Sequence, residues 1–103
     1  MLYFFGIPFR VITAIAELAS HNMGQTQFDK CQITLMGDLP VERQRQVLIH
    51  EAIHNLVDGE DVDEAFVRRL GNSLYDFLTI NDLLRDGWYE DVLAHSAHSD
   101  SQR

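Results

Sequence analysis

The chain has 103 residues, a formal net charge of -8 at pH 7 and a hydrophobic share of 46%. This length accommodates one domain with a modest core and excludes a two-lobed enzyme. The acidic balance excludes nucleic-acid binding as the main activity, because phosphate contacts need clustered Lys and Arg and the chain has a single lysine, Lys30.

The sequence also predicts where the protein works. A single cysteine, Cys31, excludes an intramolecular disulfide and fits a reducing compartment. No apolar run approaches the length needed to cross a bilayer. The apolar N-terminus is broken by Gly6 and Pro8, which is typical of a strand and turn rather than of a signal peptide. We therefore expect a cytoplasmic protein that does not bind membranes.

The first third of the chain predicts a small antiparallel sheet of about three to four strands. Tight turns are expected at Gly6-Ile7-Pro8 and near Asp29-Lys30, and helical composition predicts a short helix over residues 14–21. Aromatic and β-branched residues, or alternation of apolar and polar residues, predict strands over residues 2–5, 9–13, 25–29 and 31–36.

Helices are predicted in the rest of the chain. A helix over residues 41–57 is apolar nearly all the way round in its second half, which is typical of a buried helix. A second helix, over residues 62–80, has an apolar stripe on one side. Residues 82–93 predict a short last helix with Trp88 covering the core. We therefore expect one domain over residues 1–93 and a polar, mobile tail over residues 94–103.

The buried helix carries the motif His50-Glu51-Ala52-Ile53-His54, whose His-Glu-x-x-His spacing is typical of zinc hydrolases. On a helix the two imidazoles project about 40° apart, and Glu51 stands about 100° from His50. Burying these three side chains is costly unless each has a partner, and a divalent cation satisfies all three. The alternative is a pair of core histidines hydrogen-bonded to backbone, with Glu51 reaching solvent.

A catalytic zinc ion usually has three protein ligands and a water, so one ligand remains to be found. We favour Glu64, at the edge of the apolar arc of the following helix, with Asp63 as the next candidate. Glu64 also fits a capping box with Asp61 as N-cap. Arg68, one turn later, is placed either to hold the Glu64 carboxylate or to form a surface ion pair. The wider set of acidic candidates is Asp58, Glu60, Asp61, Asp63 and Glu64.

Such a site predicts a hydrolytic mechanism. Zinc lowers the pKa of its water and polarises the scissile carbonyl, while Glu51 takes the proton and passes it to the leaving amine. Tyr75 and His21 are candidates for stabilising the oxyanion, but neither has a spacing argument behind it.

Several segments carry a resemblance to a known family: residues 5–11, Gly24-Gln25 leading through residues 33–35, and residues 44–54, 64–70 and 74–78. They resemble the small phage and prophage branch of the ImmA/IrrE family of metallo-endopeptidases over about residues 1–80. The resemblance implies a small sheet, an active-site helix and a following helix with an acidic third ligand, which it places at Glu64. It also implies a peptidase of phage or mobile-element origin that cleaves a repressor or regulator. The chain differs from longer members in lacking a helix-turn-helix or sensor domain and in the short loop after His54.

We therefore expect an α+β protein in which the sheet packs on the active-site helix and the following amphipathic helix, as in a minimal zincin. Its expected activity is that of a zinc-dependent metallo-endopeptidase, with a protein or peptide substrate docked as an added strand on the sheet edge. The alternative is a non-catalytic zinc-binding module whose acidic surface recognises a basic protein partner. A plain structural protein would require the motif to be a coincidence.

Overall fold

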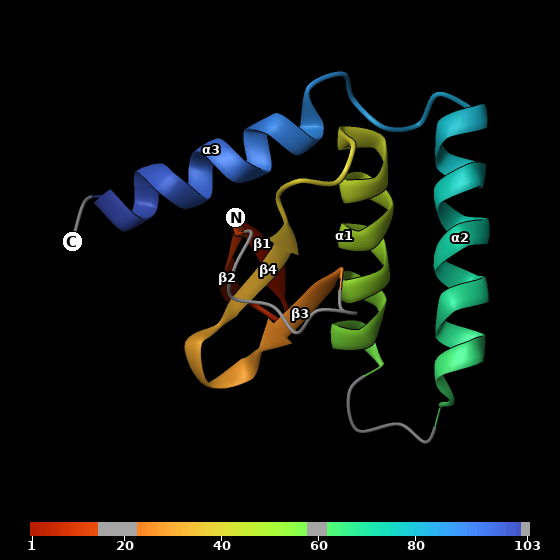
Figure 1. Ribbon diagram of the computed structural model, residues 1–103, viewed down its shortest axis with the longest axis horizontal. Helices are drawn as coiled ribbons and strands as arrows, with labels where there is room; N and C mark the ends of the chain where they lie inside the picture. Colours follow the sequence, from red (N-terminus) through yellow and green to blue (C-terminus); the bar gives the residue numbers. More distant parts are fainter. Residues whose placement is uncertain (15–22, 58–61, 102–103) are drawn as a thin grey trace.

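The computed structural model describes residues 1–14, 23–57 and 62–101, which form a four-stranded mixed sheet and three α-helices (Figure 1). This confirms the predicted α+β class. The helix expected at residues 14–21 lies outside the described residues except for Ala14, which ends a strand. Asp58, Glu60, Asp61 and His21 also lie outside the described residues.

The sheet has the order β1-β2-β4-β3 and consists of two hairpins. Each hairpin is antiparallel, but the central pair β2 and β4 is parallel, with Ile12 opposite Thr34. The expected all-antiparallel sheet is therefore wrong in its central pair. Alternation of apolar residues indicates which face of a strand is buried, but it carries no information on which strand lies next to it. The strands are β1 (Leu2–Phe4), β2 (Ile7–Ala14), β3 (Gly24–Gln27) and β4 (Gln32–Met36).

The two hairpin connections lie close to the predicted turns. The first is formed by Phe5 and Gly6, both with positive φ, as a two-residue type I′ turn requires, so that β2 begins at Ile7. The second is a short 3₁₀ helix, η1 (Phe28–Lys30), followed by Cys31 in the left-handed region.

The three helices are α1 (Val41–Leu56), α2 (Glu64–Ile80) and α3 (Trp88–Ser101). Helix α1 lies between the sheet and α2, contacting β3 and β4 on one side and α2 on the other, while α3 packs on β2 (Figure 1). The predicted packing of the sheet on α1 is correct. Helix α2, which was also expected on the sheet, packs mainly on α1, and α3 packs on the sheet instead. Within the described ranges, no helix has the length and apolar character needed to span a membrane.

The main hydrophobic core lies between the sheet, α1 and α3. Trp88 packs against it, as expected from the sequence. The core lies on the sheet side of α1, and the opposite side of that helix contacts α2. The buried members of this core are Phe4, Phe9, Val11, Ile33, Leu35, Val47, Leu48 and Tyr89.

The structure differs from the sequence-based expectation at the C-terminal end, where α3 continues past Leu93 to Ser101. Ser96 is fully buried, accepts a hydrogen bond from the backbone N–H of Val11 at 2.9 Å and donates one to the Val92 carbonyl. The expected boundary at Leu93 therefore falls inside a packed helix. The polar composition around Ser96 concealed this, because the contact with the sheet depends on a single buried serine that is bonded to β2.

Two buried tyrosines make the stability of the fold sensitive to alkaline pH. Tyr75 donates to Glu42 at 2.7 Å and Tyr89 donates to Gln44 at 2.6 Å. Burial is the larger cause that raises the pKa of each phenol from 10.0 to about 12. The second cause is a nearby carboxylate, Glu42 for Tyr75 and Glu90 for Tyr89. The unfolded chain therefore releases these protons near pH 10, and the folded protein releases them about two pH units later.

The contribution of these tyrosines to the free energy of unfolding is therefore expected to be constant below pH 10. It should fall between pH 10 and pH 12, by up to roughly 3 kcal/mol for each tyrosine. Urea unfolding at a series of pH values measures this loss. Tyr75→Phe should be less sensitive to pH across this window than the wild type. Equal slopes in the two proteins would show that the Tyr75 phenol does not contribute.

Candidate metal centre

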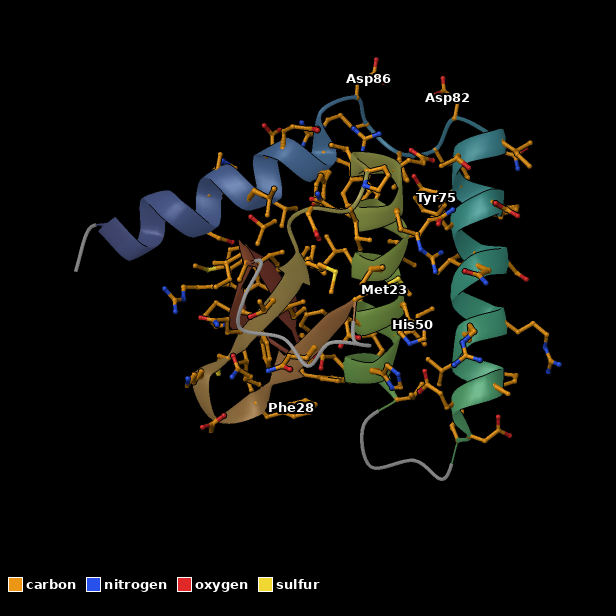
Figure 2. All side chains as sticks on the ribbon, viewed as in Figure 1. Met23, Phe28, His50, Tyr75, Asp82 and Asp86 are labelled. Carbon is orange, nitrogen blue, oxygen red and sulfur yellow. The ribbon has the colours of Figure 1, made fainter. Side chains whose placement is uncertain are left out.

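The two motif histidines project from α1 toward α2, and Figure 2 shows His50 between these helices. Glu64, the first residue of α2, meets them from the other side. Its two carboxylate oxygens lie 2.9 Å from His50 Nε2 and 2.8 Å from His54 Nε2. The two Nε2 atoms are themselves 3.1 Å apart. Three potential ligand atoms, one from each side chain, therefore lie within 4.8 Å of one another.

Hydrogen bonds within this cluster account for only two of its three close contacts. If each Nε2 carries the proton that it donates to Glu64, neither nitrogen can accept a hydrogen bond from the other across their 3.1 Å separation. Two N–H groups then face each other. A bound divalent cation removes this conflict, because both imidazoles and the carboxylate then act as electron-pair donors.

The donor set fits zinc in kind and in spacing. Two imidazole nitrogens and one carboxylate are a ligand set of catalytic zinc sites, where tetrahedral bonds of about 2.0–2.2 Å place neighbouring donor atoms about 3.3 Å apart. The nearest approaches, of each Nε2 to a different Glu64 oxygen and of the two Nε2 atoms to each other, fall a few tenths of an ångström below that value, and one ligand atom from each side chain lies within 4.8 Å of the other two. The side chains of all three residues are partly exposed, so they are accessible to an ion from solvent.

Glu51 lies in the same pocket but is held apart from the three clustered side chains. The residue is nine-tenths buried, and its carboxylate accepts a hydrogen bond from the Thr26 hydroxyl of β3 at 2.8 Å. The pocket has a volume of about 250 Å³ and opens between α1, α2 and the start of β3. It is lined by Met23, Gly24, Arg43, Gln46, Val47, His50, Glu51, His54, Glu64, Arg68 and Asn72.

The hydroxyl of Thr26 was not anticipated from the sequence, and it orients the Glu51 carboxylate. Thr26→Val keeps the shape and the strand propensity of the residue but leaves a buried carboxylate oxygen without this donor. We expect a loss of about 1–2 kcal/mol in the free energy of unfolding, measured with urea at neutral pH, and recovery of most of it in Thr26→Ser. A valine variant as stable as the wild type would mean that this hydrogen bond contributes nothing net.

Two glycines allow close packing around the pocket. A Cβ at Gly24 would lie 2.6 Å from Val47 Cγ1 and 3.5 Å from Glu51 Cγ, so any side chain there would displace the stiff valine and disturb Glu51. A Cβ at Gly71 would lie 3.5 Å from His50 Cα, which is an ordinary contact. Gly71 thus brings α2 close to α1, although alanine would also fit.

The other candidates from the sequence occupy different positions. Asp63, the next candidate for the third ligand, is the N-cap of α2 and accepts a hydrogen bond from the Phe66 N–H at 2.7 Å. Arg68 approaches Glu64 only to 4.0 Å, with both side chains largely exposed, which corresponds to a weak surface ion pair. Glu64 is therefore the carboxylate that meets the histidines.

The oxyanion candidate Tyr75 lies toward the other end of the α1–α2 interface from His50 (Figure 2), where it is bonded to Glu42 and lines a separate cavity. It does not line the pocket of His50, so its expected role near the scissile bond is not supported by its position. Among the polar residues that do line this pocket, Gln46 and Asn72 were not singled out by the sequence, because neither belongs to a recognisable motif. Comparisons with models of known protein families, with curated proteins and with solved structures give no match to this chain.

Proposed function

We propose that the chain is a zinc-dependent metallo-endopeptidase that cleaves a protein substrate. The observation that carries this proposal is the convergence of His50, His54 and Glu64 in one pocket with the separately held carboxylate of Glu51. Three donors suit a zinc ion that keeps one position open for water, which distinguishes a catalytic site from a structural site with four protein ligands.

Each side chain has a role that follows from its chemistry. When bound, zinc would polarise the scissile carbonyl and make a water acidic enough to react at neutral pH. Glu51 accepts a proton from the attacking water and later gives it to the leaving amine, as a general base and then a general acid. The Thr26 hydroxyl holds one Glu51 oxygen at 2.8 Å and so restricts the direction in which the carboxylate faces.

The position of β3 supports an extended peptide as the substrate. Within the described residues β3 is an edge strand of the sheet, and its Gly24 and Thr26 lie at the pocket, the first as a lining residue and the second bonded to Glu51. A peptide that adds to this edge would use backbone hydrogen bonds for affinity. The formal charge of -8 favours a basic segment. The resemblance to ImmA/IrrE peptidases suggests a repressor or regulator as the substrate, in a phage or mobile element, and the single Cys31 favours a cytoplasmic location.

Comparison of protein termini in a cell extract tests this proposal. Purified wild type and Glu51→Gln, each loaded with zinc, are incubated with the extract, and new peptide termini are identified by mass spectrometry. The wild type is expected to generate a small set of termini that Glu51→Gln does not. Identical profiles from two zinc-loaded proteins would contradict the peptidase proposal and leave the alternative, a zinc-binding module for a basic partner.

A further inference from the structure

The pocket of the metal centre carries two arginines in addition to its histidines and carboxylates. Arg43 of α1 and Arg68 of α2 line it, together with Glu51 and Glu64. With both histidines neutral, these four charges cancel, so a bound zinc ion would leave the pocket with two positive charges. The chain as a whole has a formal net charge of -8. The zinc-loaded pocket therefore favours a ligand group of the opposite sign to the one that the whole chain attracts.

Both arginines lie on the same side of the metal donors along the helices. Helices α1 and α2 run in opposite directions (Figure 1). Arg68 follows Glu64 by one turn of α2, about 6 Å along its axis, and Arg43 precedes His50 by two turns of α1, about 10 Å. On the wheel of α1, Arg43 lies about 20° from His50 in the direction of His54, so it continues the line of metal donors.

Neither guanidinium group is neutralised by a close carboxylate of this chain. Arg43 donates to the neutral Gln46 amide at 3.0 Å and, within the described residues, has no carboxylate partner. Arg68 approaches Glu64 only to 4.0 Å, and this carboxylate is also the candidate zinc ligand. Arg45, which lies outside this pocket, has two carboxylates within 3.5 Å. Arg43 and Arg68 are therefore available to an anionic group of a ligand.

We propose that Arg43 and Arg68 select a substrate peptide with a carboxylate two to three residues from the bond that is cleaved. An extended peptide advances about 3.3 Å per residue, so two to three residues span the 6–10 Å between the metal donors and these arginines. Guanidinium groups match carboxylates in charge and in the geometry of their donors. The carboxylate belongs either to an Asp or Glu side chain or to the C-terminus of the peptide. The rest of the peptide faces the acidic chain and is basic.

This inference rests on the proposed function, which places the scissile bond at the metal, but binding alone tests it. Zinc-loaded Glu51→Gln is immobilised and mixed with two pools of randomised octapeptides, both acetylated at the N-terminus. The first pool ends in an amide and includes Asp and Glu. The second contains no Asp or Glu and is an equal mixture of free C-terminal acids and amides. Retained peptides are sequenced by tandem mass spectrometry.

A carboxylate is expected to be enriched about fivefold in one of the two pools. Enrichment of Asp and Glu over Asn and Gln at one position of the first pool identifies a side chain. Enrichment of free acids over amides in the second pool identifies the C-terminus. No enrichment in either pool would overturn the proposal. Because no peptide bond is broken in this assay, a chain that binds peptides without cleaving them gives the same enrichment.

Arginine variants in the Glu51→Gln background test whether these two residues cause the enrichment. Arg43→Gln lies two turns from the nearest metal donor, so it should keep its zinc content and lose most of the enrichment, as should Arg68→Gln. Arg69→Gln is the matched control, because Arg69 is an exposed arginine of α2 that does not line the pocket. It removes the same charge and should select carboxylates as before. Enrichment that persists in both Arg43→Gln and Arg68→Gln would place the carboxylate on the zinc ion or elsewhere and overturn the proposal.

Discussion

Zinc at about one hundred times its dissociation constant is expected to raise the thermal unfolding midpoint of the wild type by roughly 10–20 °C, and His50→Ala is expected to abolish this increase. A ligand at that excess which binds only the folded protein contributes about 2.7 kcal/mol, and a domain of this size responds with about 4–8 °C for each kcal/mol. His50 and Glu64 belong to different helices, so the donors converge only in the folded chain. Calorimetry with and without zinc measures the shift.

His95→Ala is the matched control for this prediction, because His95 is an exposed histidine of α3 that lies outside the cluster. It should keep the whole of the zinc-induced shift. The same shift in the wild type and in His50→Ala would contradict the site, since it would indicate that zinc binds elsewhere.

The same measurement separates the two candidates for the third ligand. Glu64→Gln should reduce the zinc-induced shift, because an amide is a poorer zinc ligand than a carboxylate. Asp63→Ala should lower the stability of the zinc-free protein by about 1 kcal/mol through loss of the N-cap, while leaving the shift itself intact.

Glu51→Gln is expected to keep zinc binding and to lower the cleavage rate by about 10²–10⁴-fold, the usual contribution of a general base. The substitution preserves the shape of the side chain, and the amide oxygen can still accept the hydrogen bond from Thr26. What it removes is the ability to take a proton from water. The rate is measured on the substrate identified from the extract, and zinc content is measured on the same preparations.

Glu90→Gln makes the same chemical change at an exposed carboxylate of α3, away from the pocket. It should cleave at the wild-type rate. If Glu51→Gln and Glu90→Gln hydrolyse the substrate equally fast, Glu51 is not the base. If Glu51→Gln loses its zinc, Glu51 helps to hold the metal, and its role is not that of a base separate from the three ligands.

The local parts of the site could be predicted because they depend on helical periodicity. The spacing of His50 and His54 places both imidazoles on one side of any helix, and the acidic start of the next helix offered Glu64 within reach. Which carboxylate meets the histidines depends on how α2 docks on α1. Helical wheels constrain that docking because the small Gly71 and buried Val67 mark the contacting side of α2.

Contacts between distant segments could not be predicted in the same way. The hydrogen bond from Thr26 to Glu51 joins residues 25 positions apart and depends on the pairing of β3 with β4. The alternation of apolar and polar residues along a strand does not indicate which strand pairs with it. The parallel pairing of β2 with β4 was missed for this reason. The docking of α3 depends on one serine, Ser96, whose burial has no counterpart in the polar composition around it.

X-ray diffraction from zinc-soaked crystals, recorded on both sides of the zinc absorption edge, tests the central claim most directly. We expect one anomalous peak per chain, bonded to His50 Nε2, His54 Nε2 and a Glu64 oxygen, with a remaining position occupied by water and the Glu51 carboxylate within hydrogen-bond distance of that water. A peak with four protein ligands, or no peak between α1 and α2, would contradict a catalytic metal centre in this protein.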